Sequence, residues 1–463
     1  MAPIAQFSGL ASGIDSASLI NALVEAKLRT NELRKKDISS LEAENSSLDE
    51  LNTKILTLSD LIDKFRTANG GGVNKKSSSS DSSVATAAVS AAASNSTIGV
   101  TVTSLASAGT ASFADSYVDG NAQFATAIGT QAIAVDVGTG ADLVNISVNI
   151  TSATTVQEFV DAFNADSDAS GRATASLVRV ADNDYRVAIT SLKSGLAEGQ
   201  LAFVVPLGPG NFTDTSDLQT RTLNQATNAV FNISGIASGI TRKTNSINDV
   251  LSGVTLQLSK LGSASISISD DSETSADSFK EIVDAFNDLV TFVKENNAVT
   301  QDTRSRDKSS IYGSLAKATI DDDFISRFRE GLLSAASAST GSVQTFADLG
   351  VSTNRDGTLA MDLEKFKAGI SSDSNGTTSL LRTFADSAGG VTGFMYQFTT
   401  FQGFIDNAQN ANLSSITSLN ASIEQLQRSA DKLKDRYTQT FARLESITAR
   451  LQNQQSQLTA AFK

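Results

Sequence analysis

The last 50 residues carry a heptad repeat, which limits the folds open to this chain more than any other feature. One row with a spacing of seven is apolar throughout and includes one tyrosine: Ile416, Ile423, Ala430, Tyr437, Leu444, Leu451 and Leu458. The interleaved row holds Leu419, Leu426, Leu433 and Ile447, with polar exceptions at Thr440 and Gln454. Such a sustained repeat favours a coiled coil about 70 Å long over a single long helix packed in a globular bundle.

The first 70 residues form a second helical segment. A turn is expected from Gly9 to Gly13, after which Asp15 or Ser16 can cap the helix. One heptad row contains Leu41, Leu48, Ile55 and Ile62, and the other contains Leu51, Leu58 and Phe65 and is broken by Glu44. Each terminal helix needs a partner for its apolar stripe, and the nearest candidate is the other end of the same chain. The pattern therefore predicts a helical hairpin in which residues 41–65 and 416–461 lie against each other.

Apolar surface left over from this hairpin is expected to pack on other subunits. The predicted contact residues are Leu41, Leu48, Ile55, Ile62, Ile416, Ile423, Leu433, Leu444, Ile447, Leu451 and Leu458.

Between the helical ends, the chain changes to alternating and β-branched runs. These runs cover residues 98–105, 132–137, 144–150, 186–190, 202–205, 229–233, 254–258 and 264–268. Period-two spacing with Gly, Asn and Asp turns predicts antiparallel sheet. One short helix is expected at residues 156–164, and a Lys- and Ser-rich linker at residues 75–83. The helical period returns at residues 279–293 and 324–333.

Composition excludes several classes of function. The formal charge of −13 argues against nucleic-acid binding, which needs clustered Lys and Arg, and against attachment to anionic membranes. The chain contains no Cys and no His, so it lacks thiolate chemistry, the commonest general base and the commonest zinc ligand. We therefore predict no catalytic residue, no cofactor and no metal site.

Three acidic or glycine-rich motifs were weighed as ligand sites. Asp321-Asp322-Asp323 is interpreted as a helix start, because no further ligands follow at a recognised spacing. Asp182-Asn183-Asp184 is expected to be a hairpin turn, and Gly138-Thr139-Gly140 lacks the third glycine of a phosphate loop. Asp270, Asp271 and Glu273 are expected to cap the next helix.

The N-terminal residues show neither a basic start nor an apolar run of signal-peptide length. No run approaches the ~18 apolar residues of a membrane span. Cytoplasmic residence and export by a leaderless route are the two hypotheses that remain.

Taken in order, several segments resemble the flagellar filament cap family, also called flagellar hook-associated protein 2. The N-terminal signature is Gly9-Leu10-Ala11-Ser12-Gly13-Ile14-Asp15, and residues 100–106 resemble a first head strand. Residues 159–164, 173–177 and 185–191 are similar to a distal-head motif. The most specific match is Asn228 to Ile236 followed by Asn245 to Leu256. Residues 279–293 resemble a family helix, with Phe286 where Tyr is usual, and residues 348–362 complete the series.

The resemblance implies an α+β multidomain fold. Long terminal helices would form an antiparallel coiled-coil leg, with two mostly antiparallel-β head domains inserted between them. The implied domains are a leg of residues 1–45 and 415–463, a helical leg-proximal domain of 46–75 and 273–414, an inner head of 84–112 and 226–272, and an outer head of 113–225.

The resemblance also implies a function outside the cell. A ring of about five or six subunits would cap the flagellum tip, promote the folding and polymerisation of exported flagellin, and prevent its leakage. Implied partners are flagellin, the hook–filament junction proteins, a cytoplasmic export chaperone and the type III flagellar export apparatus. An accessory adhesin role for the head is a further possibility. The alternatives are a different axial protein, such as a flagellin or a junction protein, and a hydrolase built on Asp or Glu.

Overall fold

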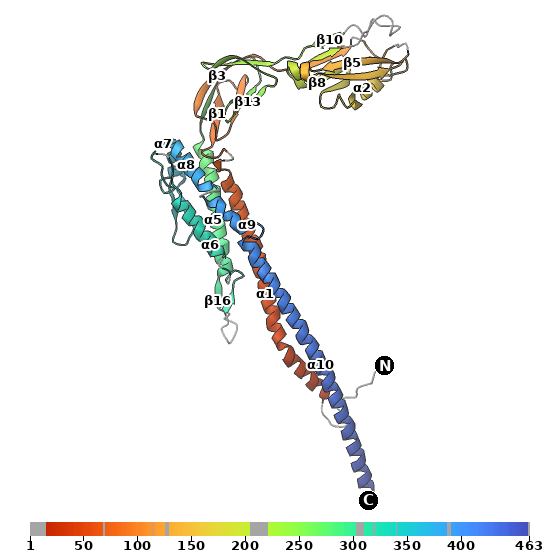
Figure 1. Ribbon diagram of the computed structural model, residues 1–463, viewed down its shortest axis with the longest axis vertical. Coiled ribbons are helices and arrows are strands. Elements are labelled where there is room, and N and C mark those ends of the chain that lie inside the picture. The colour runs from red at the N-terminus through yellow and green to blue at the C-terminus, as the bar shows by residue number, and fades with distance from the viewer. Residues whose placement is uncertain are drawn as a thin grey trace. The chain divides into compact units, whose positions relative to one another are not determined.

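The computed structural model describes residues 15–67, 70–113, 115–125, 129–203, 221–301, 310–316, 318, 320–338, 340–386 and 390–461. The chain divides into two compact units (Figure 1). Unit 1 is Met1–Asn69 with Ala276–Lys463, and unit 2 is Gly70–Ser275. The predicted fold class is confirmed: long helices stand at both ends of the chain, and antiparallel sheets lie between them. Within the described residues, no helix is long and apolar enough to cross a membrane.

Unit 1 is built on its two terminal helices, α1 (Ser16–Asp63) and α10 (Phe404–Ala461). The predicted N-cap of α1 is confirmed, since the Asp15 carboxylate accepts a 3.0 Å hydrogen bond from the backbone N–H of Ser18. This bond satisfies one of the free N–H groups at the helix start. The predicted turn from Gly9 to Gly13 lies outside the described residues. In Figure 1, α1 and α10 run side by side along much of their length.

Shorter helices complete unit 1: most of α5 (Ser272–Asn297), α6 (Ile320–Ser334), α7 (Leu363–Ser372), α8 (Ser374–Ala385) and α9 (Val391–Thr399). Two small strand pairs accompany them, β16 (Val299–Gln301) with β17 (Ser310–Tyr312) and β18 (Val351–Thr353) with β19 (Leu359–Met361).

Phenylalanine rings form the centre of the unit 1 bundle. Phe286 stacks on Phe328 at 4.5 Å between ring centroids, and Phe279 stacks on Phe346 and Phe366 at 5.0 and 5.1 Å. These contacts place the predicted apolar face of α5 in the core, because period-3.6 spacing puts such residues on one side of a helix.

The first core of unit 2 lies between two antiparallel sheets. The five-stranded sheet has the order β1 (Lys75–Ser79), β15 (Gly262–Asp270), β3 (Ser96–Ser104), β11 (Ala229–Ile233) and β12 (Ala237–Arg242). The three-stranded sheet has the order β13 (Ser246–Leu251), β14 (Val254–Leu258) and β2 (Ala85–Val89). Alternate residues such as Val100, Phe231 and Ile266 point inward and are fully buried. We call this core, drawn from residues 84–106 and 229–268, the inner cluster.

The prediction of a linker at residues 75–83 is wrong for its first half. Lys75–Ser79 form the edge strand β1, which pairs with β15 from Lys75↔Asp270 to Ser79↔Ile266. An edge strand needs no apolar side chains of its own, so its Lys and Ser content resembled a linker. The Lys75 ammonium and the Asp270 carboxylate, 2.5 Å apart and both largely covered, fix the start of the pairing.

The second core of unit 2 also lies between two antiparallel sheets. One has the order β10 (Arg221–Asn224), β4 (Ala108–Phe113), β8 (Asp184–Ser194) and β7 (Ala173–Ala181). The other has the order β6 (Val144–Ile150), β5 (Gln131–Val137) and β9 (Leu201–Phe203). Helices α2 (Val156–Ala165) and α3 (Leu196–Gly199) accompany them. The predicted strand at 202–205 is β9 as far as Phe203, and Val204 and Val205 lie outside the described residues.

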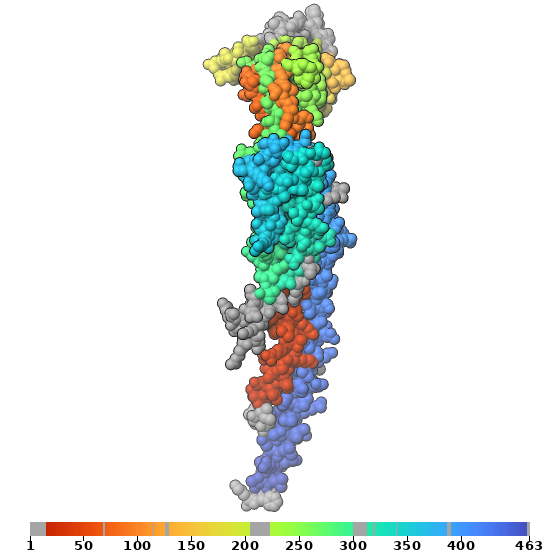
Figure 2. Space-filling view, turned by 90° about the vertical axis from the view of Figure 1, so that its left-hand side faces the viewer, coloured from red at the N-terminus to blue at the C-terminus, as the bar shows by residue number. Residues whose placement is uncertain are grey.

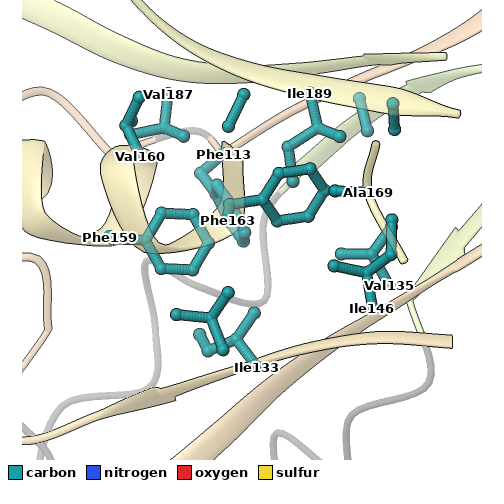
Figure 3. Packing of buried hydrophobic residues seen from close by; sticks show 14 of the residues in the cluster. Phe113, Ile133, Val135, Ile146, Phe159, Val160, Phe163, Ala169, Val187 and Ile189 are labelled. Carbon is teal, nitrogen blue, oxygen red and sulfur yellow. The ribbon is translucent and has the colours of Figure 1, made fainter. Parts of the chain in front are cut away.

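Helix α2 supplies the aromatic centre of this core, which we call the outer cluster (Figure 3). A capping box between Thr155 and Glu158 starts the helix, and Phe159 and Phe163 are fully buried beneath it. Phe159 stacks on Phe124 with ring centroids 4.1 Å apart. The helix predicted at 156–164 is therefore confirmed. The division of the chain into four domains stays a prediction, although unit 2 contains two separate apolar clusters.

Replacing Phe159 with alanine should lower the unfolding free energy of the outer cluster by about 3–5 kcal/mol, because it removes a stacked ring and leaves a cavity. Hydrogen exchange of the amides of β5 and β8 measures this loss, and the amides of β3 and β15 in the inner cluster should keep their protection. Val180→Ala, at an exposed position of β7, is the control. Equal loss of protection in both clusters would contradict the separation of the two cores.

Candidate assembly surface on the terminal helices

Side-chain hydrogen bonds fix how α1 and α10 pair. The Gln409 amide donates to the Asp49 carboxylate at 2.6 Å, and the Asn412 amide donates to the Asn45 side-chain oxygen at 2.9 Å. Further along, the Lys27 ammonium donates to the Ser429 hydroxyl at 2.8 Å. Residue numbers fall on α1 as they rise on α10, so the two helices are antiparallel.

This register corrects one expectation. Residues 41–65 were expected to lie against residues 416–461, but Asn45 already meets Gln409 and Asn412. Only the N-terminal half of α1 therefore lies opposite the heptads of α10. The remainder of α1 is buried in the bundle of unit 1, where Leu51 and Leu58 are fully covered.

Polar residues enter the seam between the helices where α1 lies opposite these heptads, alongside the buried Ile20 and Ala430. Asn31 is 4% exposed, and its amide donates to the backbone oxygen of Ile423 at 3.4 Å. The Arg34 guanidinium donates to the Asn31 side-chain oxygen at 3.1 Å and to the Ser422 backbone oxygen at 3.4 Å. Sequence analysis did not identify these residues. Counting back by sevens from Leu48 and Leu41 gives Arg34, Lys27 and Ile20, so a signal for Arg34 is present in that heptad row, whereas Asn31 lies outside both rows.

The predicted contact residues fall into three groups. Leu48, Ile55 and Ile62 are fully buried within the chain, so they are not free to touch another subunit. Leu41, Ile416, Ile423 and Leu433 are half-buried along the helix pair. Leu444, Ile447, Leu451 and Leu458 are exposed. The role of these residues in subunit contacts stays a prediction.

The four exposed residues form one stripe, which we call the α10 stripe: Leu444, Ile447, Leu451 and Leu458. They keep the three- and four-residue spacing of a coiled-coil seam. Their exposed fractions run from 45% at Leu444 to 60% at Leu451. Figure 2 shows the end of α10 continuing past the described start of α1, and the α10 stripe belongs to this part of the helix.

The acidic and glycine-rich motifs of the sequence analysis form turns and helix starts. Within the described residues, no group of three or more Asp and Glu side chains could hold a metal ion. Asp182 and Asn183 form the two-residue turn between β7 and β8, where Asn183 has a φ of 56°. Asp271 caps α5, because its carboxylate accepts from the Thr274 N–H at 3.2 Å. Gly138 sits in a tight turn after β5, with a φ of 85°. The turn at Asp182 and Asn183 and the helix cap by Asp271 follow the sequence interpretation.

Asp321 differs from its neighbours because its side chain is fully buried in the first turn of α6. The Asn297 amide donates to one carboxylate oxygen at 2.6 Å, while the other oxygen and the Asn297 side-chain oxygen have no partner among the described residues. Burial raises the pKa of the Asp321 carboxyl above its ordinary value, which the Asn297 hydrogen bond only partly offsets.

Comparison with known proteins decides the family. A model of the flagellar hook-associated protein 2 C-terminus matches residues 226–462, and a model of the N-terminus of the same family matches residues 12–109. The chain belongs to the flagellar hook-associated protein 2 family. The family is that of a structural flagellar cap and not of an enzyme.

Curated relatives agree with this membership. The A-type flagellar hook-associated protein 2 of Pseudomonas aeruginosa is 26% identical over 501 aligned residues, which cover 100% of this chain and 98% of the relative. The flagellar hook-associated protein 2 of Salmonella typhimurium is 28% identical over 328 residues, covering 67% of each chain.

A solved structure shares the fold. The crystal structure of the flagellar cap protein FliD D1-D2-D3 domains from Escherichia coli has a TM-score of 0.57 to this chain at 20% identity. The match covers 78% of this chain and 99% of that one. At this identity the likeness supports the fold alone, and the family rests on the sequence matches.

Asp321→Asn should stabilise unit 1, and the gain should grow with pH. The wild-type carboxyl has its pKa raised in the folded state, so its charge costs stability above that pKa and costs nothing once both states are protonated at low pH. An uncharged amide avoids this cost and can donate to the unpartnered Asn297 oxygen. We expect a gain of about 1–3 kcal/mol at neutral pH, shrinking as pH falls toward the ordinary aspartate pKa.

Urea denaturation of the wild type and the variant at several pH values measures this gain. Asp322→Asn, which removes an exposed charge from the same helical turn, is the control and should change stability little. A gain independent of pH would show that the buried charge is not its source.

Proposed function

We propose that this chain caps the distal tip of the bacterial flagellar filament, retains exported flagellin there, and promotes its folding and polymerisation. Family membership supports the cap role. The α10 stripe is the observation that supports contact with neighbouring molecules. It continues the heptad seam of α10 beyond the part that the described residues of α1 cover.

The stripe suits a helical partner. Apolar residues at alternating spacings of three and four insert between side chains of a facing helix, and in water such a row is stable only when covered. Flagellin and the junction proteins are the partners that we assign to it. We expect the cap to be a ring of about five or six copies, because closed cyclic rings are a common form of homo-oligomer.

The chain's chemistry suits passage through an export channel before assembly outside the cell. It has no Cys, so no disulfide can form and obstruct threading, and its 3 Pro residues limit slow isomerisation during refolding. A cytoplasmic chaperone and the type III flagellar export apparatus are the proposed export partners. An accessory adhesin role for the head stays a prediction that no contact in the structure favours.

Deleting the gene in the source bacterium tests the cap role. Cells without the chain should secrete unpolymerised flagellin into the medium and carry few or short filaments, and the wild-type gene should restore both. Immunoblotting of the medium and electron microscopy of the cells give the two readouts. Normal filaments in the deletion strain would overturn the proposal.

Leu444→Asp combined with Leu451→Asp tests the α10 stripe. The two charges stand at exposed positions, so the thermal stability of the isolated chain should change little, whereas desolvating them at an apolar contact should cost several kcal/mol. We expect this variant to leak flagellin as the deletion does.

The matched control is Ser446→Asp with Asn453→Asp, which adds the same charge to exposed positions of the same helix segment, off the stripe. The control should cap filaments normally. Normal capping by the stripe variant, or equal failure of both variants, would remove the stripe from the mechanism.

A further inference from the structure

Two chain crossings connect the inner and outer clusters of unit 2. The chain leaves the inner cluster between β3 and β4 and returns between β10 and β11. The two crossings pair with each other through Ser107 and Thr227, whose backbones exchange hydrogen bonds of 3.0 and 3.2 Å. Two paired strands alone form a ribbon that bends and twists easily, and motion between two cores is the default when little apolar surface joins them.

A turn of the inner cluster reaches onto this ribbon. Residues 243–245 connect β12 to β13, and the Asn245 amide group holds Ala106 in the outgoing crossing. Its oxygen accepts from the Ala106 N–H at 2.7 Å, and its nitrogen donates to the Ala106 carbonyl at 2.9 Å. One side chain therefore satisfies both backbone groups of Ala106, the residue at which the outgoing crossing leaves the inner cluster, as a neighbouring strand would.

The same turn meets a turn of the outer cluster. The Ser194 hydroxyl donates to the Lys243 backbone oxygen at 2.7 Å, and the Lys243 ammonium pairs with the Glu198 carboxylate. Gly195 has a φ of +85°, and a Cβ built on it would lie 2.6 Å from the Lys243 Cβ. The two turns therefore approach so closely that only glycine fits between them.

A side chain also holds the returning crossing, between β10 and β11, against the outer turn. The Asn228 side-chain oxygen accepts from the Leu196 N–H at 2.9 Å, next to Gly195 in the outer turn. Asn228 and Asn245 both belong to the motif that gave the most specific sequence resemblance. Their described bonds go to backbone groups at the junction of the two clusters.

We propose that the turn of residues 243–245 is a clasp that holds the outer cluster in one orientation against the inner cluster, with Asn245 and Lys243 as its positioning residues. The clasp consists of hydrogen bonds and one exposed ion pair, and among the described residues the two apolar clusters stay separate. Its loss should therefore release the orientation while leaving both cores folded. This inference stands on the junction geometry and does not depend on the cap role.

Spin labels on the full chain test the clasp. The chain has no Cys, so Ala162→Cys on α2 and Ser269→Cys on β15, both exposed, introduce the only two labelling sites. Pulsed electron paramagnetic resonance should show one narrow distance peak in this background. Adding Asn245→Ala should broaden the peak, and Gly195→Ala, which forces the two turns apart, should shift or broaden it as well.

The matched control is Asn232→Ala. The Asn232 side chain also accepts a backbone N–H, that of Gly239 at 2.7 Å, but within the inner sheet. This control should leave the distance peak narrow, and hydrogen exchange of β5 and β15 should match the wild type in every variant. A narrow, unshifted peak in both junction variants, or a broad peak in the background itself, would overturn the clasp.

Discussion

The antiparallel contact between α1 and α10 is the constraint on which the rest of unit 1 depends. It brings together residues as distant in sequence as Lys27 and Ser429. The chain that connects the two paired helices must therefore leave the helix pair and return to it. The five shorter helices of unit 1 and the whole of unit 2 are inserted in this way. An insertion costs little once the ends are paired, because loop-closure entropy grows only with the logarithm of loop length. Sheets with separate cores can therefore be inserted in the same chain while its two terminal helices stay paired.

The sequence predicts the existence of this pair but not its register. Heptad rows look alike in every repeat, so Ile416, Ile423 and Ala430 offer equivalent partners to a facing helix. The choice among them is made by the polar contacts at Asn31, Arg34 and Asn45, which a search for apolar residues passes over. Polar seam residues of this kind fix alignment at a cost in stability, and they become visible only when the facing helix is known.

The sheets likewise include strands that the sequence predicts and strands that it does not. The sequence predicts alternating runs such as those of β5, β6 and β14 because their inward side chains are apolar. It does not distinguish β1 from a linker, because an edge strand can be all Ser and Lys. Helices α7 to α9 are short and were not predicted. For the assembly surface, sequence periodicity predicts Leu444, Ile447, Leu451 and Leu458 as seam-type positions, and all four are exposed. Periodicity cannot show that these are exposed while Leu48 and Ile62 are buried, because that depends on where the partner helix begins.

Large buried side chains are distributed unevenly, which implies a gradient of local stability. The largest fully buried residues are all phenylalanines, and they lie in the bundle of unit 1 and in the two clusters of unit 2. The helix pair from Lys27 to Asn31 holds mainly half-buried aliphatic residues and polar contacts instead. Since local opening is easiest where few apolar side chains are buried, this stretch of the helix pair should open at lower free energy than the bundle of unit 1. Its opening leaves intact the phenylalanine cores that keep the bundle and the two clusters of unit 2 folded.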